Sequence, residues 1–196
     1  MRISASSEPS TGGAAAQIAP VEIRPQIFRN GRMAADGFTS AADDAALSSG
    51  AVIVSLKRFL AEKDALLSRA GPLGVRLESS QSPELLVDGI SRLSLVELHI
   101  PYFKDGRAFS WARLLRSRLH FAGEIRLTGH FLPDQIAFFM RVGVDSFALP
   151  RNISAAEVED FTGQISGFYQ PSTDHRPTIR DLRRRGGRSP ELIPAP

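Results

Sequence analysis

Short apolar runs alternate along residues 51–165 with segments in which leucine and other large apolar residues recur every three or four positions. The runs have the β-branched content of strands, and the intervening segments have the spacing of amphipathic helices. The pattern predicts strands at 51–56, 73–79, 95–103, 124–128 and 146–149. The helix expected after the second strand spans 83–93. Five strand–helix units with short connections predict an α/β fold with a parallel sheet and right-handed crossovers.

Residues that favour helix ends mark several boundaries. Ser110 is predicted to cap the helix after the third strand, and Pro133 to begin the helix after the fourth. Gly143 is predicted to end that helix, because glycine readily adopts the left-handed backbone conformation found just past a helix. Ser154 and Glu157 have the spacing of a capping box, in which each side chain bonds the backbone N–H of the other residue.

Three of the expected strands alternate between apolar and polar residues. The polar positions are Arg76 and Glu78, then Glu97 and His99, then Glu124, Arg126 and Thr128. Because successive side chains of a strand point to opposite faces, we expect one apolar face covered by helices and one charged face. This pattern favours an open TIM-barrel-like segment, since a full barrel needs about 250 residues. The alternative, a flavodoxin-like doubly wound sheet, would have to bury those charges.

The two ends of the chain lack the apolar periodicity of a folded core. The expected division is a disordered N-terminal tail at 1–20, an extended arm with a short helix at 21–50, the α/β domain at 51–171 and a disordered basic, Pro- and Arg-rich tail at 172–196. Within the arm, Asn30 and Gly31 form a turn dipeptide, and the short helix is expected between Ser40 and Ser48.

Composition excludes several kinds of site. The chain has no cysteine, which excludes disulfides, thiolate nucleophiles and cysteine-ligated metal clusters. No stretch approaches the roughly 20 apolar residues of a membrane-spanning helix, and the first residues lack the apolar core of a signal peptide, so we expect a cytoplasmic protein. The formal net charge of +3 comes mainly from the arginine-rich tail, so nucleic acid is not the expected partner.

Ligands in parallel α/β folds bind at the carboxyl ends of the strands. Asp105, Gly106 and Arg107 follow the third expected strand, and His130 follows the fourth. The guanidinium fork of Arg107 could grip a carboxylate, a phosphate or a sulfur oxyanion. The competing interpretation is that Asp105 and Arg107 only hold their loop in shape.

The charged sheet face has two interpretations as well. Buried charges must pair with one another, so the face is either a structural ion-pair network or an oxyanion or acid–base site. Glu97 and His99 lack a third metal ligand nearby in the sequence, and no glycine-rich nucleotide loop, nucleophile elbow or zinc-protease motif occurs. We therefore expect no metal and no cofactor.

Several of these residues belong to longer motifs. The motifs are Phe103-Lys104-Asp105-Gly106-Arg107-Ala108-Phe109-Ser110, Gly123-Glu124-Ile125-Arg126, Gly129, Asp134-Gln135 and residues 141–147. Through them, residues 25–150 resemble a bacterial family of unknown function, domain-of-unknown-function family 934 (DUF934). Members are typically encoded beside assimilatory sulfite reductase and adenylylsulfate-reducing enzymes, and some carry an oxidoreductase label tied to sulfite reduction. The resemblance implies a role in assimilatory sulfate reduction but no mechanism.

Two hypotheses follow from the motifs and the resemblance, and whether the protein is an enzyme stays open between them. The first is an accessory protein of sulfate and sulfite reduction, which binds a sulfur oxyanion or the sulfite-reducing enzyme and does no redox chemistry itself. The alternative is a barrel-segment enzyme in which Asp105, Arg126 and the inner-face carboxylates do acid–base chemistry. Arg107 and Arg126 are expected to reach one small anion. The expected binding residues are Asp105, Arg107, Ser110, Arg126, His130, Asp134 and Gln135.

Overall fold

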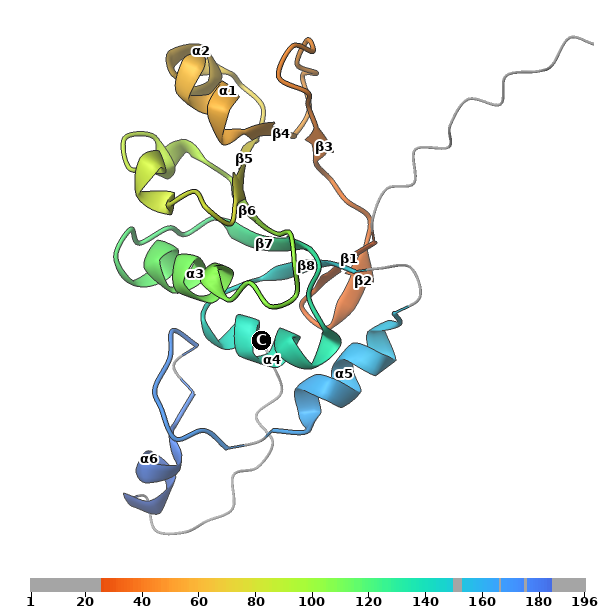
Figure 1. The fold of residues 1–196 in the computed structure, drawn as a ribbon, viewed down its shortest axis with the longest axis vertical. Helices are drawn as coiled ribbons and strands as arrows, with labels where there is room; N and C mark the ends of the chain where they lie inside the picture. The colour runs from red at the N-terminus through yellow and green to blue at the C-terminus, as the bar shows by residue number, and fades with distance from the viewer. Residues whose placement is uncertain (1–25, 150–152, 166, 175, 185–196) are drawn as a thin grey trace, which may run out of the picture.

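An eight-stranded sheet, curled into a half-barrel, organises the chain (Figure 1). The structure is a computed structural model that describes residues 26–149, 153–165, 167–174 and 176–184. The strands are β1 (Gln26–Arg29), β2 (Arg32–Ala34), β3 (Thr39–Ser40), β4 (Val52–Ser55), β5 (Leu73–Glu78), β6 (Leu95–Ile100), β7 (Glu124–Gly129) and β8 (Ser146–Leu149). They lie in the order β2-β1-β8-β7-β6-β5-β4-β3. Strands β3 to β8 are parallel, and β1 is antiparallel to both of its neighbours.

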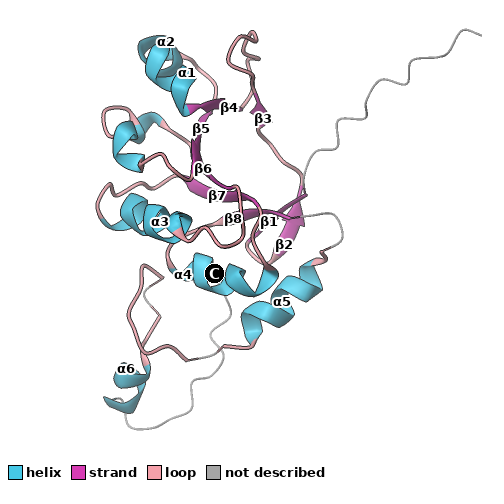
Figure 2. Cartoon of the chain, viewed as in Figure 1, coloured by secondary structure: helices cyan, strands magenta, loops and turns pink. Residues whose placement is uncertain are grey.

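The helices between the parallel strands lie along the convex face of the sheet (Figure 2). These elements are α1 (Leu56–Ala61), α2 (Lys63–Ser68), η1 (Pro83–Leu86), η2 (Ile90–Arg92), α3 (Arg107–Ser117), η3 (Pro133–Gln135) and α4 (Ile136–Arg141), and α5 (Ala155–Gly163) and α6 (Ile179–Arg184) follow β8. Strands β4 to β8 follow one another across the sheet in chain order, without the reversal that a doubly wound sheet needs. The expected mixed α/β fold with a mostly parallel sheet is confirmed, and the flavodoxin-like alternative is wrong.

The N-terminal arm supplies both edges of the sheet. Asn30 and Gly31, with φ of 52° and 72°, form the tight turn between β1 and β2, as this dipeptide favours. Residues 35–38, here called the strap, then lead from β2 at one edge to β3 at the other. Eight strands in a flat sheet would place these edges roughly 34 Å apart, whereas the chain from Ala34 to Thr39 can span at most about 18 Å. The sheet must therefore curl, and the strap crosses its open side (Figure 1).

The alternation along β5, β6 and β7 places the apolar side chains against the helices. The buried apolar residues of these strands on the face that meets the helices are Leu73, Val75, Leu77, Val96, Leu98, Ile100, Ile125 and Leu127. They join one core cluster with Phe59 of α1, Leu115 of α3 and Phe139 of α4. The opposite, concave face carries the polar positions, so the predicted division of the sheet into two faces is correct.

The predicted helix ends are mostly confirmed. Gly143 has a φ of +100° just past α4, a conformation that glycine adopts without strain. Ser154 and Glu157 form the expected capping box at the start of α5, with hydrogen bonds of 2.7 and 3.2 Å. The prediction that Ser110 caps this helix is wrong, because α3 already begins at Arg107 and Ser110 lies inside it.

Two predicted helices differ from the structure. Between β5 and β6 the chain forms the short 3-10 turns η1 and η2 instead of one α-helix. Gly89 separates them, and its backbone lies so close to Phe59 that a Cβ there would be 3.0 Å from the ring. The helix expected from Ser40 to Ser48 is replaced by turns, because Arg58 binds the carbonyl groups of Ala42 and Ala45 at 2.6 and 2.8 Å.

The segment after α5 packs on the end of α4. The guanidinium of Arg141 donates to Asp174 at 3.1 Å and to the carbonyl of Gln170 at 2.8 Å, and it lies 3.7 Å from the ring centre of Phe168. Helix α6 follows within the range expected to be a disordered tail, while residues 1–25 and 185–196 lie outside the described residues. None of the described helices combines the length and apolarity needed to cross a membrane.

Arg116 of α3 joins three segments at the amino end of the sheet. Its guanidinium donates to the carbonyl groups of Gly143, Phe121 and Gly123, and it forms an ion pair with Asp145. Arg116 therefore fixes the loop before β7 and the loop before β8 to the same helix. Nearby, Arg118 forms an ion pair with Glu84, and both side chains are exposed.

We expect Arg116→Ala to lower the free energy of unfolding by about 2–4 kcal/mol, because three carbonyl groups lose a charged donor at once. The matched control is Arg118→Ala, which should cost less than about 1 kcal/mol, as exposed ion pairs usually do. Urea denaturation of the two variants measures the difference. Equal stabilities for the two variants would show that Arg116 does not hold the loops before β7 and β8 on α3.

Candidate functional site

The polar residues of the concave face stand in two rows that cross neighbouring strands. In the first row Arg76, Glu97, Arg126 and Ser146 are in register on β5 to β8. In the second row Glu78, His99 and Thr128 are in register nearer the carboxyl ends of β5 to β7. The structure thus brings the expected inner-face residues together.

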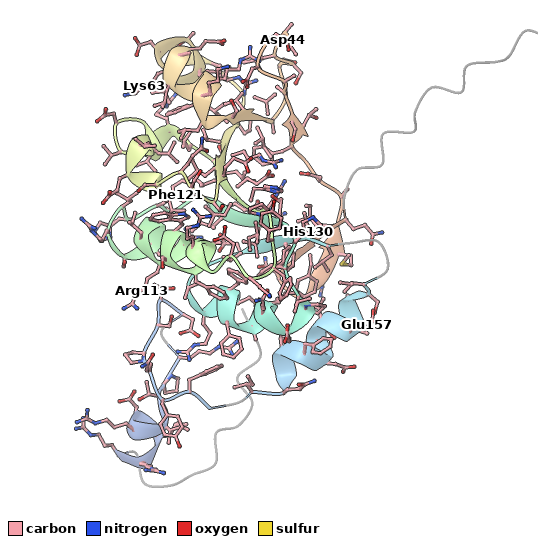
Figure 3. All side chains as sticks on the ribbon, in the orientation of Figure 1. Asp44, Lys63, Arg113, Phe121, His130 and Glu157 are labelled. Carbon is pink, nitrogen blue, oxygen red and sulfur yellow. The ribbon has the colours of Figure 1, made fainter. Side chains whose placement is uncertain are left out.

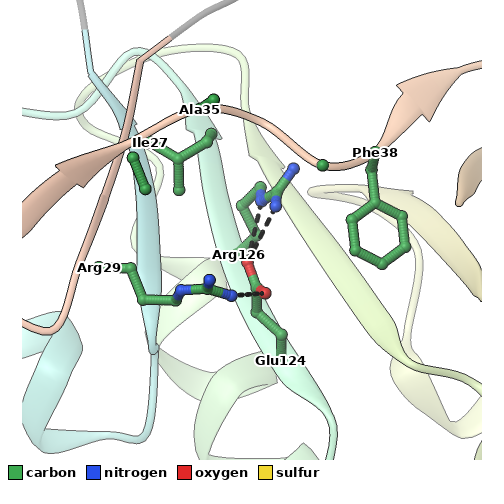
Figure 4. A pocket seen from close by; sticks show the side chains of 8 residues that line it. Ile27, Arg29, Ala35, Phe38, Glu124 and Arg126 are labelled. Carbon is green, nitrogen blue, oxygen red and sulfur yellow. Dashed lines mark hydrogen bonds and ion pairs between the residues drawn. The ribbon is translucent and has the colours of Figure 1, made fainter.

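Arg126 is buried within a cluster of acidic side chains. Its Nη1 donates to Asp36 of the strap at 2.8 Å, and its Nη2 donates to Glu124 at 3.0 Å. The Phe38 ring lies 5.5 Å from the guanidinium, and Arg29 binds the other oxygen of Glu124 at 2.9 Å. Figure 4 shows Arg29 and Arg126 converging on Glu124 from two strands. With a side chain only 3% exposed and carboxylates on two sides, Arg126 is committed to the fold.

A pocket of about 130 Å³ lies beneath the strap, next to this cluster (Figure 4). Its walls are formed by Ile27, Arg29, Ala34, Ala35, Gly37, Phe38, Glu124 and Arg126. Burial raises the pKa of Glu124, but the Ser146 hydroxyl and the Arg126 guanidinium outweigh it and hold the pKa below its usual value of 4.5. Glu124 therefore stays ionised as the partner of two arginines.

Glu97 is buried without comparable partners. It is 5% exposed; its Oε1 lies 3.6 Å from Nη1 of Arg76 and accepts a hydrogen bond from Thr128 at 3.4 Å. Although Arg126 is its register neighbour, no ion pair joins the two among the described residues. Burial raises the pKa of Glu97 above 4.5, against the lowering effects of Arg76 and Arg126. The same face thus carries one firmly ionised carboxylate and one that holds its proton more readily.

At the carboxyl rim, Arg107 is paired with its own loop. Its Nε and Nη2 donate to the two oxygens of Asp105 at 2.9 and 2.6 Å, and Nη2 also donates to Ser79 at 3.0 Å. These hydrogen bonds hold the pKa of Asp105 well below its usual range. The indole of Trp111 donates to the Ser79 carbonyl at 3.0 Å. Arg107 and Arg126 therefore bind different carboxylates, and the structure does not bring them together on one acceptor.

The other expected binding residues lie on the segments that follow β6 and β7: Ser110 is in α3, and His130, Asp134 and Gln135 lie between β7 and α4 (Figure 3). Ser110, His130 and Asp134 are exposed. Gln135 joins the loops, because its amide oxygen accepts from Leu132 N–H at 3.1 Å and its Nε2 donates to the Phe103 carbonyl at 3.5 Å. Six of the seven expected binding residues thus lie at this rim, while Arg126 lies on the concave face. No group of three or more His, Asp or Glu side chains suited to a metal ion occurs in the described part of the chain.

Sequence reasoning missed two features of these regions. Tyr102, Phe103 and Leu132 expose 74%, 49% and 44% of their surface on the two loops that Gln135 joins. The signal was a pair of adjacent aromatic residues at the carboxyl end of the expected strand 95–103, where ligands bind; the structure ends β6 at Ile100, so both residues lie in the loop that follows it. Asp36 and Phe38 of the strap had no local signal, because their partner Arg126 is 90 residues away from Asp36 in the chain.

The fold and its concave face define a mixed α/β protein with a half-barrel sheet and a charged inner surface. Residues 74–179 match the family described as "Bacterial protein of unknown function (DUF934)", and the chain belongs to this family. The match confirms the resemblance drawn from the sequence motifs. Neither a curated protein nor a solved structure matches the chain.

Glu97→Gln and Glu124→Gln should change the pH dependence of stability in opposite directions. Folding lowers the pKa of Glu124 below 4.5. The stability of wild type relative to Glu124→Gln should therefore increase as the pH rises from this lowered pKa to 4.5. Folding raises the pKa of Glu97 above 4.5. The stability of wild type relative to Glu97→Gln should therefore decrease as the pH rises from 4.5 to this raised pKa. Denaturant unfolding at several pH values between about 3 and 8 measures both differences. The same sign for both variants would show that the two carboxylates do not differ as described.

Proposed function

We propose that this protein is an accessory protein of assimilatory sulfate and sulfite reduction, which docks on the sulfite-reducing enzyme and does no redox chemistry itself. The observation that carries the docking role is the exposed group of Tyr102, Phe103 and Leu132, here called the rim patch. Large aromatic side chains in such a position are typical anchors of protein interfaces. The family resemblance supplies the pathway, and a cytoplasmic location follows from it.

Binding of a sulfur oxyanion at the rim is the less favoured form of this role. The guanidinium of Arg107 already binds both oxygens of Asp105, and Arg126 lies between Glu124 and Asp36. An anion at either place would have to displace a carboxylate at close range, which removes most of the electrostatic gain. A protein partner needs no such exchange, since the rim patch is already exposed.

The half-barrel also supports a proposed relationship to TIM barrels. Strands β4 to β8 follow one another in chain order, as the strands of a singly wound barrel do. We count η1 and η2 as the helical part of the second of five strand–helix units. On this proposal the rim patch lies where TIM-barrel proteins bind their ligands.

The second candidate function is acid–base catalysis on the concave face. It is favoured by Glu97, a buried carboxylate whose nearest cation lies 3.6 Å away. In this candidate Asp105 and Arg126 hold the structure in place, because both are fully engaged with charged partners.

A triple variant tests the docking role. We expect Tyr102→Ser, Phe103→Ser and Leu132→Ser together to weaken binding to the sulfite-reducing enzyme of the same organism by at least about 10-fold, since interface anchors contribute more than 1 kcal/mol each. The matched control changes Leu60, Leu85 and Val87 to Ser; these are 50–55% exposed on the outer helical layer. Isothermal titration calorimetry measures the affinity of both triple variants and of the wild type for the enzyme. Undiminished binding by the rim variant, or equal losses in both, would remove the docking assignment.

A deletion strain tests the pathway separately. It should grow on sulfide or cysteine as the only sulfur source and grow poorly on sulfate or sulfite, because the missing step precedes sulfide. Growth curves on the four sulfur sources, with and without the gene on a plasmid, measure the requirement. Normal growth of the deletion strain on all four would refute the pathway.

A further inference from the structure

Glu97, Thr128 and His99 form a continuous chain of polar atoms on the concave face. Oε1 of Glu97 lies 3.4 Å from the Thr128 hydroxyl oxygen, and that oxygen lies 3.3 Å from Nδ1 of His99. Glu97 and His99 lie on β6, and Thr128 lies on β7 in register with His99. The chain runs from a buried carboxyl group toward the carboxyl ends of the strands.

The far end of this chain is open to a ligand. Within the described residues, Nε2 of His99 has no hydrogen-bond partner. No buried side-chain nitrogen or oxygen among these residues lacks a partner, so Nε2 is not fully buried there. Gly129 allows β7 to end against the imidazole, since a Cβ at this residue would lie 2.9 Å from its Cε1. Arg76, with 38% of its side chain exposed, stands on the neighbouring strand.

A threonine hydroxyl has only one hydrogen, so it links the protonation states of its two neighbours. When Glu97 is ionised, Thr128 donates to it and accepts a hydrogen bond from Nδ1–H of His99, which leaves Nε2 as a base. When Glu97 is protonated, its hydrogen bonds to Thr128, Thr128 donates to Nδ1, and Nε2 carries the proton.

We propose that Glu97, Thr128 and His99 form an acid–base site for a small anion that carries an exchangeable proton. His99 Nε2 takes the proton of the ligand, His99 Nδ1 releases its proton to Thr128, and the Thr128 hydroxyl proton passes to Glu97. Each acceptor gains one bond to hydrogen and each donor loses one, so the proton lost by the ligand ends on the Glu97 carboxylate. The reverse sequence returns it.

Arg76 couples this transfer to the binding of the anion. Its guanidinium faces two carboxylates, with Nε donating to Glu78 at 3.0 Å and Nη1 lying 3.6 Å from Glu97. When the proton reaches Glu97, one of these two negative charges disappears. Arg76 then attracts the deprotonated ligand more strongly than the starting ligand, which is the differential binding that favours catalysis.

Burial and the neighbouring charges bring the pKa values of Glu97 and His99 closer together. Burial raises the pKa of Glu97, with Arg76 and Arg126 lowering it and Asp36 of the strap raising it. Burial and Arg76 lower the pKa of His99, Glu78 raises it, and His130 lowers it. A carboxyl and an imidazole with converging pKa values exchange a proton at little cost. The site shares no residue with the rim patch and does not depend on the proposed docking role.

The tautomer of His99 tests the relay. In the wild type at neutral pH, ¹⁵N NMR should find the proton of neutral His99 on Nδ1, because Nδ1 donates to Thr128. In Thr128→Val, which keeps the shape of the side chain, the proton should move to Nε2. The control Thr162→Val removes a half-buried hydroxyl on α5, which donates to the Glu159 carbonyl at 3.1 Å, and it should leave the His99 tautomer unchanged. A wild-type proton on Nε2, or an unchanged tautomer in Thr128→Val, would overturn the relay.

Inorganic phosphate is a suitable probe for the ligand, since near neutral pH it carries both anionic oxygens and an exchangeable proton. We expect phosphate to shift the His99 resonances saturably in the wild type and at least about 10-fold more weakly in Arg76→Gln. The control Arg113→Gln removes an exposed charge on α3 and should keep the wild-type response. Absence of a saturable shift at His99, or equal responses in Arg76→Gln and wild type, would overturn the assignment of this site.

Discussion

The strap that carries the chain from β2 to β3 constrains every other part of the fold. Its few residues join the two edges of an eight-stranded sheet, and they are far too short to cross the width of a flat one. The sheet is therefore held curled, and the ion pair between Asp36 and Arg126 fixes the strap over its concave face. Closing the open side in this way covers polar groups that would otherwise face water on an open sheet.

The strap also produces a division of partners within the first polar row of the concave face. Arg126 pairs with Asp36 and Glu124, and Arg29 completes a network of alternating charges that joins the strap, β1 and β7. Glu97, the register neighbour of Arg126 on β6, forms no ion pair with it among the described residues and contacts Arg76 and Thr128. A carboxylate with so little compensation is costly to bury, and such groups are characteristic of functional sites. The chemistry that we infer for the face follows from this division.

Local patterns in the sequence were sufficient for strands β4 to β8, the two faces of the sheet and most helix ends, but not for β1 to β3, which lie in the segment expected only as an extended arm. The period of two along β5 to β7 depends only on adjacent residues, and the capping box at Ser154 lies within four residues. The side chains that Arg107 and Arg126 bind could not be predicted from local sequence patterns. Arg107 was expected to hold a ligand but binds Asp105 two residues earlier, and Arg126 binds Asp36 in an arm whose place over the sheet depends on the whole topology. The sequence showed the adjacent aromatic residues at the end of the third expected strand, but only the fold shows that Tyr102, Phe103 and Leu132 are exposed on neighbouring loops.

Asp36 holds Arg126 at 2.8 Å, and Glu97 forms no ion pair with this register neighbour among the described residues. Burial raises the pKa of Glu97, and the negative charge of Asp36 adds to that effect. ¹³C NMR titration of the Glu97 carboxyl in wild type and in Asp36→Asn measures the contribution of Asp36. We expect a wild-type pKa above 4.5 and a lower pKa in the variant, because a negative charge is removed and Arg126 becomes free to turn toward Glu97. A wild-type pKa at or below 4.5, or a pKa that Asp36→Asn leaves unchanged, would rule out this role of Asp36.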